Sequence, residues 1–268
     1  MMAPVNKGRA MIYQTITYET HGDVAVLTLN RPNVMNALTS ALRRELLAAI
    51  THASTHARAI VITGAGRAFC SGQDLDDATQ LGPADFERLL RDEYEPLLHA
   101  IYDCKVPTIA AVNGAAAGAG ANLALACDVV IAAHSASFIQ SFTRIGLIPD
   151  AGGTYWLPRQ IGMPRAMGAA LFADKITATQ AANWGMIFEA IPDADFPAHW
   201  QVRAAHLAQG PTTAYAHLKA ALRASFANDL ATQLALEARL QGQCGQTTDF
   251  TEGVAAFLEK RPAKFRGC

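Results

Sequence analysis

The chain has 268 residues, a formal net charge of −1, 51% hydrophobic residues and 17% charged residues. This composition predicts an ordered globular protein with one sizeable core, and the near-zero charge argues against nucleic-acid binding through a general basic surface. No apolar run approaches the roughly 18 residues that cross a bilayer, so we expect no membrane association.

The N-terminal part predicts a lead, a hairpin and a helix. Residues 1–12 carry basic side chains with no apolar stretch after them, which predicts a disordered lead rather than a secretory signal. Residues 15–19 and 24–29 alternate around a His-Gly-Asp turn, as in a β-hairpin. Thr39 or Ser40 can cap a helix that runs to about residue 53.

Strands and helices alternate along the rest of the chain. An apolar strand over residues 59–63 precedes a helix over 83–104, and a strand over 108–112 opens a strand–helix–strand stretch. Further helices are predicted over 163–172 and 178–184, a short strand over 186–191, helices over 195–245 with a break at Gly210-Pro211, and a helix over 248–261.

Repeated strand–turn–helix units predict an α/β fold. The chain shows no linker long enough to separate independent domains. We expect residues 13–194 to form the core with the functional site. Residues 195–268 are helical throughout and are expected to form a C-terminal subdomain.

The cysteines indicate a reducing compartment. The chain has five of them, an odd number, and no Cys-x-x-Cys pair. This pattern fits a cytoplasmic protein and does not fit a structural zinc site.

Two Gly-rich turns follow apolar strands and are the main functional signal. One runs from Gly64 to Leu75, and the other opens at Asn113 and is built almost wholly from Gly and Ala. Small residues let a ligand approach the backbone closely. Two such turns can each present an N–H group to one point, which is what an oxyanion hole requires.

The glycines also permit other interpretations. Gly118-Ala-Gly120 lacks the third glycine of a dinucleotide fingerprint, and no Gly-Lys-Ser/Thr phosphate loop is present. Close packing of a helix on a strand is the structural alternative, and composition alone does not decide between it and an oxyanion hole.

Four motifs in this order resemble the enoyl-CoA hydratase/isomerase (crotonase) superfamily. They are Ala-Phe-Cys-Ser-Gly-Gln-Asp-Leu from residue 68, Ala-Ala-Val-Asn-Gly from 110, Ala-Cys-Asp-Val-Val-Ile-Ala from 126 and Gly-Leu-Ile-Pro-Asp-Ala-Gly-Gly-Thr from 146. The resemblance covers roughly residues 13–265. Gly-Gln-Asp-Leu, Ala-Ala-Gly-Ala-Gly-Ala, Ile-Pro-Asp-Ala-Gly-Gly-Thr-Tyr-Trp-Leu-Pro-Arg and Trp-Gly-Met-Ile are most similar to the isomerases that form an oxepin in phenylacetate degradation.

The resemblance implies a spiral of ββα units with C-terminal helices that build homotrimers, often paired into hexamers. It implies an acyl-CoA substrate, with coenzyme A as part of the thioester and no tightly bound cofactor. The backbone N–H groups of Gln73 and Ala119 match the oxyanion donors.

The two Glu residues of the family's hydratases match Asn122 and Phe142 here. Neither side chain can transfer a proton, so ordinary two-Glu hydration is not expected. Asp150 matches the acidic residue that other members use as base or nucleophile. One carboxylate can remove a thioester α-proton and return it elsewhere when two amides hold the enolate oxygen. On local pattern alone, a helix cap or turn residue is the favoured interpretation of Asp150, and the absence of both Glu residues together with the narrower resemblance reverses that preference.

The remaining site residues follow from the same resemblance. Lys260 matches a contact to the CoA phosphates, although a basic C-terminal run is more often a solvated tail. Arg31 is expected to join it, because an anionic cofactor on a near-neutral protein needs a local cation. The loop residues that match the adenine cradle are Ala68, Ser71, Asp74 and Leu75. The acyl pocket is expected to include Asn122, Phe138, Phe142 and Tyr155.

The predicted function is isomerisation of an acyl-CoA thioester. The first substrate is the ring 1,2-epoxide of phenylacetyl-CoA, with a shift of 3-enoyl-CoA to 2-enoyl-CoA as a second activity. A 2-enoyl-CoA hydratase and a non-catalytic CoA-binding partner protein are the alternatives.

Overall fold

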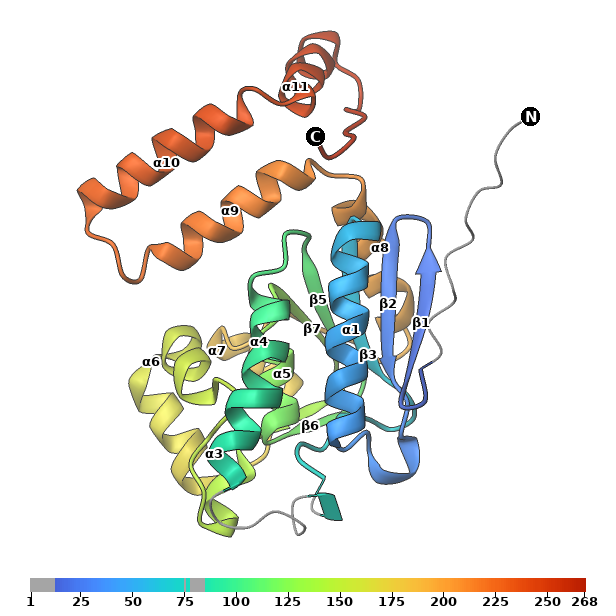
Figure 1. The fold of residues 1–268 in the computed structure, drawn as a ribbon, viewed down its shortest axis with the longest axis vertical. Coiled ribbons are helices and arrows are strands. Elements are labelled where there is room, and N and C mark those ends of the chain that lie inside the picture. The colour runs from blue at the N-terminus through green and yellow to red at the C-terminus, as the bar shows by residue number, and fades with distance from the viewer. Residues whose placement is uncertain (1–12, 75, 78–84) are drawn as a thin grey trace.

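The computed structural model describes residues 13–74, 76–77 and 85–268 (Figure 1). The predicted lead over residues 1–12 and the site residue Leu75 lie outside these ranges.

The larger sheet forms the centre of the core. In the described part of the chain it has six strands in the order β1, β2, β3, β5, β7, β10. These strands span Ile16–His21, Val24–Leu29, Ala59–Gly64, Thr108–Val112, Val129–Ala133 and Glu189–Ile191. The pair β1 and β2 is the predicted hairpin, and all the other neighbours are parallel. The central strands β3 and β5 are buried almost throughout, as expected for parallel strands covered on both faces.

A smaller sheet receives the chain after each central strand. It has the order β4, β6, β8, β9 within the described residues, and these strands span Ala68–Cys70, Ala115–Ala117, Ser137–Ile139 and Ile176–Thr177. The chain passes from β3 to β4, from β5 to β6 and from β7 to β8, and a helical segment follows each pair. This repetition confirms the predicted ββα spiral. The sequence prediction missed these short strands.

Helices cover both faces of the larger sheet. Helices α1 (Ser40–His56) and α4 (Glu95–Tyr102) lie side by side over one face, and α8 (Phe196–Ala208) packs on the other (Figure 1). Thr39 caps α1, because its hydroxyl accepts a hydrogen bond from the Leu42 amide at 3.3 Å.

The predicted helix over residues 83–104 is interrupted in its described part. It contains α3 (Asp85–Leu89), a π-helix over Leu90–Tyr94, and then α4. The helix α5 (Ala119–Leu125) begins directly after β6. Helix α6 (Gly153–Phe172) starts ten residues before the predicted start at 163 and bends at Gly162, whose φ is 74°. Helix α7 (Ala178–Trp184) matches its prediction.

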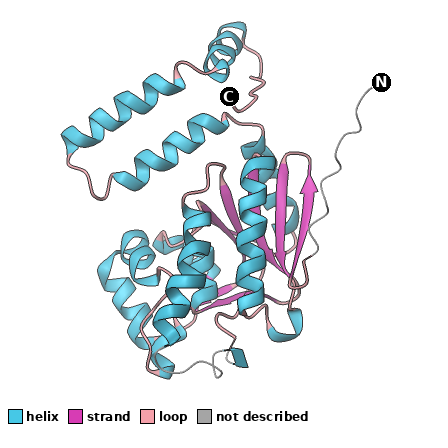
Figure 2. Cartoon of the chain, in the orientation of Figure 1, coloured by secondary structure: helices cyan, strands magenta, loops and turns pink. Residues whose placement is uncertain are grey.

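The chain beyond β10 is helical, whereas the strands gather in the rest of the molecule (Figure 2). Helices α9 (Thr212–Ala224), α10 (Leu230–Cys244) and α11 (Thr248–Glu259) extend beyond the body that holds the sheets (Figure 1). The helical stretch predicted over residues 195–245 has a second break, between α9 and α10. Lys219 and Arg223 of α9 pair with Asp128 at 2.7 and 2.6 Å and tie this extension to the core.

The C-terminal helices and the turn between α9 and α10 carry a concentration of exposed apolar side chains. These are Leu218, Leu222, Phe226, Leu230, Leu234, Phe250, Val254, Phe257 and Leu258. No helix within the described ranges is both long and apolar enough to cross a bilayer.

Candidate active site

A cavity of about 750 Å³ collects residues from both Gly-rich turns. Its lining includes seven residues that the sequence singled out: Arg31, Ser71, Gln73, Asp74, Ala119, Phe142 and Asp150. The π-helix, the segment before α1 and the 3₁₀ helix η3 (Ser141–Ile145) supply other lining side chains.

The two turns touch backbone to backbone at Gly72. Its φ is 95°, and a Cβ added there would lie 2.8 Å from the Ala117 carbonyl oxygen and 3.4 Å from the Ala119 nitrogen. Only glycine therefore fits this position without moving the turns apart. This contact brings the segment that contains Gln73 and the segment that contains Ala119 together at the cavity.

The Gln73 and Ala119 amides are available to a ligand. Leu38 bonds to the residues that flank Gln73: the Leu38 amide donates to Gly72 O at 2.8 Å, and the Asp74 amide donates to Leu38 O at 3.1 Å. In such a bridge the N–H of Gln73 faces the opposite way. Ala119 is the first residue of α5, so its N–H has no acceptor within the helix. Neither amide finds an acceptor among the described residues.

Asp150 lies in the turn that leads into α6. The Gly153 amide and the Asn122 Nδ2 both donate to its carbonyl oxygen, at 2.8 and 2.7 Å. The N-cap of α6 is Gly152, without a side-chain cap, so the alternative that Asp150 serves as helix cap is not realised.

The Asp150 carboxylate is unusual in its surroundings. Its Oδ1 is buried and hydrogen bonds to no group in the described part of the chain. Burial raises the pKa of this carboxyl to about 6, against a smaller lowering effect of its own backbone amide. A carboxylate that is desolvated and titrates near neutral pH is suited to general-base work.

Three predicted pocket residues do not line this cavity. Asn122 is fully buried and holds the Asp150 turn, while its Oδ1 accepts a 2.8 Å hydrogen bond from Gln140 Nε2. Phe138 is fully buried in β8. Tyr155 lines a separate cavity of about 500 Å³ beside α9, where its ring packs against Arg159 at 3.6 Å.

Some of the predicted CoA contacts line this cavity, and others do not. Arg31 Nη1 pairs with Asp74 Oδ2 at 2.7 Å, and this hydrogen bond holds the pKa of the Asp74 carboxyl below its usual range. Ser71 lies on the cavity wall. Ala68 is buried in β4, and Lys260 is the exposed residue that ends α11, outside the cavity lining.

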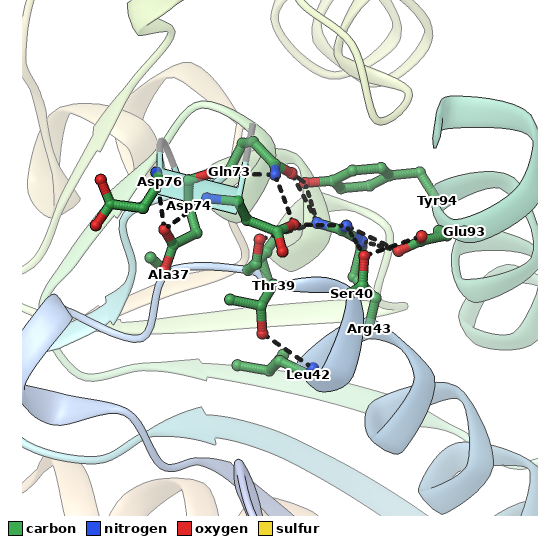
Figure 3. A network of polar contacts seen from close by, with 12 residues as sticks. Ala37, Thr39, Ser40, Leu42, Arg43, Gln73, Asp74, Asp76, Glu93 and Tyr94 are labelled. Carbon is green, nitrogen blue, oxygen red and sulfur yellow. Dashed lines mark hydrogen bonds and ion pairs between the residues drawn. The ribbon is translucent and has the colours of Figure 1, made fainter. Parts of the chain in front are cut away.

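Arg43 is a functional candidate that sequence reasoning missed. Its side chain is fully buried in the first turn of α1 and bonds to Gln73 and Glu93 (Figure 3). The available signal was a charged residue on the face that also presents Leu46, Ile50 and Ala53 to the core. Tyr94, also missed, lines the cavity, and its hydroxyl donates to Gln73 Oε1 at 2.6 Å.

No group of three metal-ligating side chains lies together within the described ranges.

Comparisons with known proteins point to one family. The family model described as enoyl-CoA hydratase/isomerase matches residues 19–268. A relative from Rhodobacter capsulatus, named "Probable enoyl-CoA hydratase", is 65% identical over 96% of this chain and 100% of its own. The 1,2-epoxyphenylacetyl-CoA isomerase of Escherichia coli is 43% identical over 91% of this chain and 95% of its own.

The solved structures agree on the fold. The crystal structure of an enoyl-CoA hydratase from Bacillus anthracis superposes with a TM-score of 0.91 at 32% identity, covering 95% of this chain and 100% of that one. The resemblance in sequence, the crotonase-type spiral and its helical C-terminal part are thereby confirmed.

Proposed function

The chain belongs to the enoyl-CoA hydratase/isomerase family, and from that membership we propose that it is a CoA-thioester isomerase with Asp150 as its base. One observation carries the proposal. Asp150 lines the same cavity as Gln73 and Ala119, and its buried Oδ1 lacks a partner among the described residues. Its pKa of about 6 leaves it ionised at neutral pH and still basic enough to accept a carbon-bound proton.

The residues have separate roles in the proposed reaction. The Gln73 and Ala119 amides bind the thioester oxygen and stabilise the negative charge that develops on it. Asp150 removes the α-proton and becomes a neutral carboxylic acid. The same acid returns that proton to another carbon of the acyl group, so substrate and product contain the same atoms and the reaction is an isomerisation.

We propose the ring 1,2-epoxide of phenylacetyl-CoA as the first substrate. The carbon–carbon bond shared by the ring and the epoxide opens to the seven-membered oxepin. The α-proton moves to a ring carbon, which leaves a double bond outside the ring. The similarity to the Escherichia coli isomerase supports this choice. The apolar lining residues Phe86, Leu90, Phe142 and Leu147 suit a hydrocarbon ring. The same base can move the double bond of a 3-enoyl-CoA.

Hydration of 2-enoyl-CoA is the second candidate, favoured by the name of the Rhodobacter capsulatus relative. The site argues against it. Asn122 and Phe142 stand where the resemblance expects two Glu residues, and neither transfers a proton. Three other described aspartates line the cavity: Asp74 and Asp77 are each paired with an arginine, and Asp76 is exposed to solvent. A non-catalytic CoA-binding protein would have no use for a buried carboxylate such as Asp150.

The proposal includes CoA binding and assembly. Arg31, Ser71 and Asp74 lie on the cavity wall and are proposed to contact the CoA portion. Lys260 lies outside that wall, so we propose that it reaches the CoA phosphates of a neighbouring copy. The exposed apolar side chains of α9, α10 and α11 support a homotrimer or hexamer. The described cysteines are all free, which supports a cytoplasmic location.

An activity panel tests the proposal. Purified protein would receive the ring-epoxide, a 3-enoyl and a 2-enoyl CoA thioester under the same conditions. We expect turnover of the epoxide, slower shift of the 3-enoyl double bond, and poor hydration. Hydration within the ordinary enzymatic range of roughly 1–10³ s⁻¹, with no isomerisation, would establish the hydratase instead. CoA binding without turnover of any of the three would favour the non-catalytic alternative.

A further inference from the structure

We propose that Arg43 is a positioning residue that holds the Gln73 amide where it binds the thioester oxygen. This inference rests on the proposed function, because it concerns the oxyanion donor of that reaction. Arg43 is absent from the cavity lining, so it acts through Gln73 rather than on the substrate.

Every N–H bond of the buried Arg43 guanidinium donates a hydrogen bond. An arginine has five N–H bonds, and leaving any of them unpaired in the interior is costly. Here each has an acceptor at 2.7 to 3.3 Å: Glu93 Oε2, Leu38 O, Gln73 Oε1, Ser40 Oγ and Asp77 Oδ2. The planar group therefore has one orientation, fixed by α1, the π-helix and the segment that contains Gln73.

Two of these bonds define the position of Gln73. Arg43 Nη1 donates to the Leu38 carbonyl oxygen at 2.9 Å, and that oxygen also accepts from the Asp74 amide. Nη1 donates as well to Gln73 Oε1 at 2.7 Å. One nitrogen thus holds the backbone bridge beside Gln73 and the end of its side chain. Fixing both leaves the Gln73 peptide little freedom to rotate.

The π-helix supplies the second support. Its last two residues enter the same network (Figure 3). Glu93 Oε1 accepts from Ser40 Oγ at 3.0 Å, and its Oε2 accepts from Arg43 Nε at 2.8 Å. The Tyr94 hydroxyl donates to Gln73 Oε1 at 2.6 Å. Single-turn π segments inside helices occur frequently at functional sites. This one directs the Glu93 carboxylate to Arg43 and the Tyr94 hydroxyl to Gln73.

The role of Arg43 is geometric. Its charge faces the carboxylates of Asp77 and Glu93, at 3.3 and 2.8 Å, so little positive field remains for the substrate. Geometry can be separated from charge by Arg43→Lys. Lysine keeps the cation that Asp77 and Glu93 need, but its single nitrogen has three N–H bonds and cannot reach five acceptors.

The experiment compares Arg43→Lys with Arg44→Lys, the same change at the adjacent exposed arginine. For each variant, kcat, KM and binding of free CoA would be measured. The absorption of bound cinnamoyl-CoA would be recorded too, because polarisation of its carbonyl moves the band to longer wavelength. We expect Arg43→Lys to lower kcat between about 10-fold and the roughly 10²–10³-fold of a lost oxyanion donor. It should also reduce the spectral shift and leave free-CoA binding unchanged. Arg44→Lys should match wild type.

Tyr94→Phe is a second variant that removes only the hydroxyl bonded to Gln73, so it covers the case in which Arg43→Lys fails to fold. It should show a smaller loss of kcat and of spectral shift. Wild-type kcat and spectral shift in the folded Arg43→Lys variant, or in Tyr94→Phe if Arg43→Lys does not fold, would overturn the inference and leave the proposed function standing. A wild-type protein that neither binds CoA nor shifts the cinnamoyl band would overturn both.

Discussion

Asn122 Nδ2 lies 2.7 Å from the carbonyl oxygen of Asp150 and donates a hydrogen bond to it. Asn122 is fully buried in α5, and Asp150 belongs to the turn before α6. The contact is so close that a Cβ on Gly153 would lie 2.4 Å from the same Nδ2. Asn122 therefore sets the distance between the helix that carries one oxyanion amide and the turn that carries the proposed base.

Replacing this amide should affect both stability and catalysis. In Asn122→Ala, the Asp150 carbonyl loses a buried donor and Gln140 Nε2 loses its acceptor. We expect a loss of about 1–3 kcal/mol in the free energy of unfolding, measured with urea. We also expect a lower kcat, because the base is no longer held, with little change in KM. Asn183→Ala, the same change at an exposed position of α7, is the control. Wild-type stability in Asn122→Ala would contradict this account of the turn.

Asp150→Asn tests the proposed base directly. Asparagine keeps the size of the side chain and removes its ability to accept the α-proton. The loss of a general base typically costs about 10²–10⁴-fold. We expect the upper end, because the other described aspartates of the cavity are engaged by arginines (Asp74 and Asp77) or exposed to solvent (Asp76). Exchange of the α-proton of a bound acyl-CoA in deuterated water should occur with wild type and stop in the variant. Both proteins should bind CoA equally. Undiminished exchange in the variant would reject Asp150 as base.

The raised pKa of Asp150 predicts two effects of pH. Activity should rise with pH through an apparent pKa of about 6, because only the ionised carboxylate is a base. Stability should change in the opposite sense. Since the folded-state pKa lies above the unfolded value of 3.8, folding favours the protonated acid, and this contribution is lost as pH rises from about 4 through about 6.

Asp150→Asn should therefore be more stable than wild type at pH 8, by up to about 3 kcal/mol for a shift of roughly two pKa units. At pH 3.5 the difference should be close to zero. Thermal unfolding at both pH values measures this. Equal stabilities of the two proteins at pH 8 would mean that the carboxylate pays no desolvation penalty in the fold.

Gly72→Ala should separate the two oxyanion turns. The new methyl would approach the Ala117 carbonyl oxygen to 2.8 Å, and φ is positive as well. We expect kcat to fall by at least about 10²-fold, comparable to a lost oxyanion donor. Gly22→Ala is the matched control, because φ is 61° there and nothing lies within 4 Å. This control should lose only about 1–2 kcal/mol of stability, the cost of a left-handed backbone conformation at an alanine. Equal activity in the two variants would show that close approach of the turns is not needed.

Lys260→Ala should raise KM for the thioester and leave kcat nearly unchanged. A contact with the CoA phosphates lies far from the reacting carbons and contributes equally to ground state and transition state. Added salt should weaken wild type more than the variant. Lys175→Ala, which also removes one exposed positive charge, is the control for net charge. Identical KM values for all three proteins at low ionic strength would remove Lys260 from the site.

Local chemistry along the chain was enough to predict much of this protein. Apolar runs indicated the buried strands β3 and β5, Thr39 indicated the start of α1, and the Gly-rich turns and Asp150 were visible as motifs. These features depend on neighbours within a few residues, which a sequence displays directly. The three-residue strands β4, β6 and β8 escaped prediction because they are too short to show a period of two.

Tertiary structure alone decided how the side chains are used. Arg43 meets Glu93 fifty residues away, and Asn122 meets the Asp150 carbonyl twenty-eight residues away. No local pattern encodes such pairings, because they depend on how the ββα units stack. The same stacking buries Phe138 in the core and places Tyr155 in a different cavity. Whether the Asp150 side chain caps a helix or keeps its Oδ1 without a partner among the described residues was likewise undetermined by its neighbours, since it depends on which backbone amides the folded turn brings within reach.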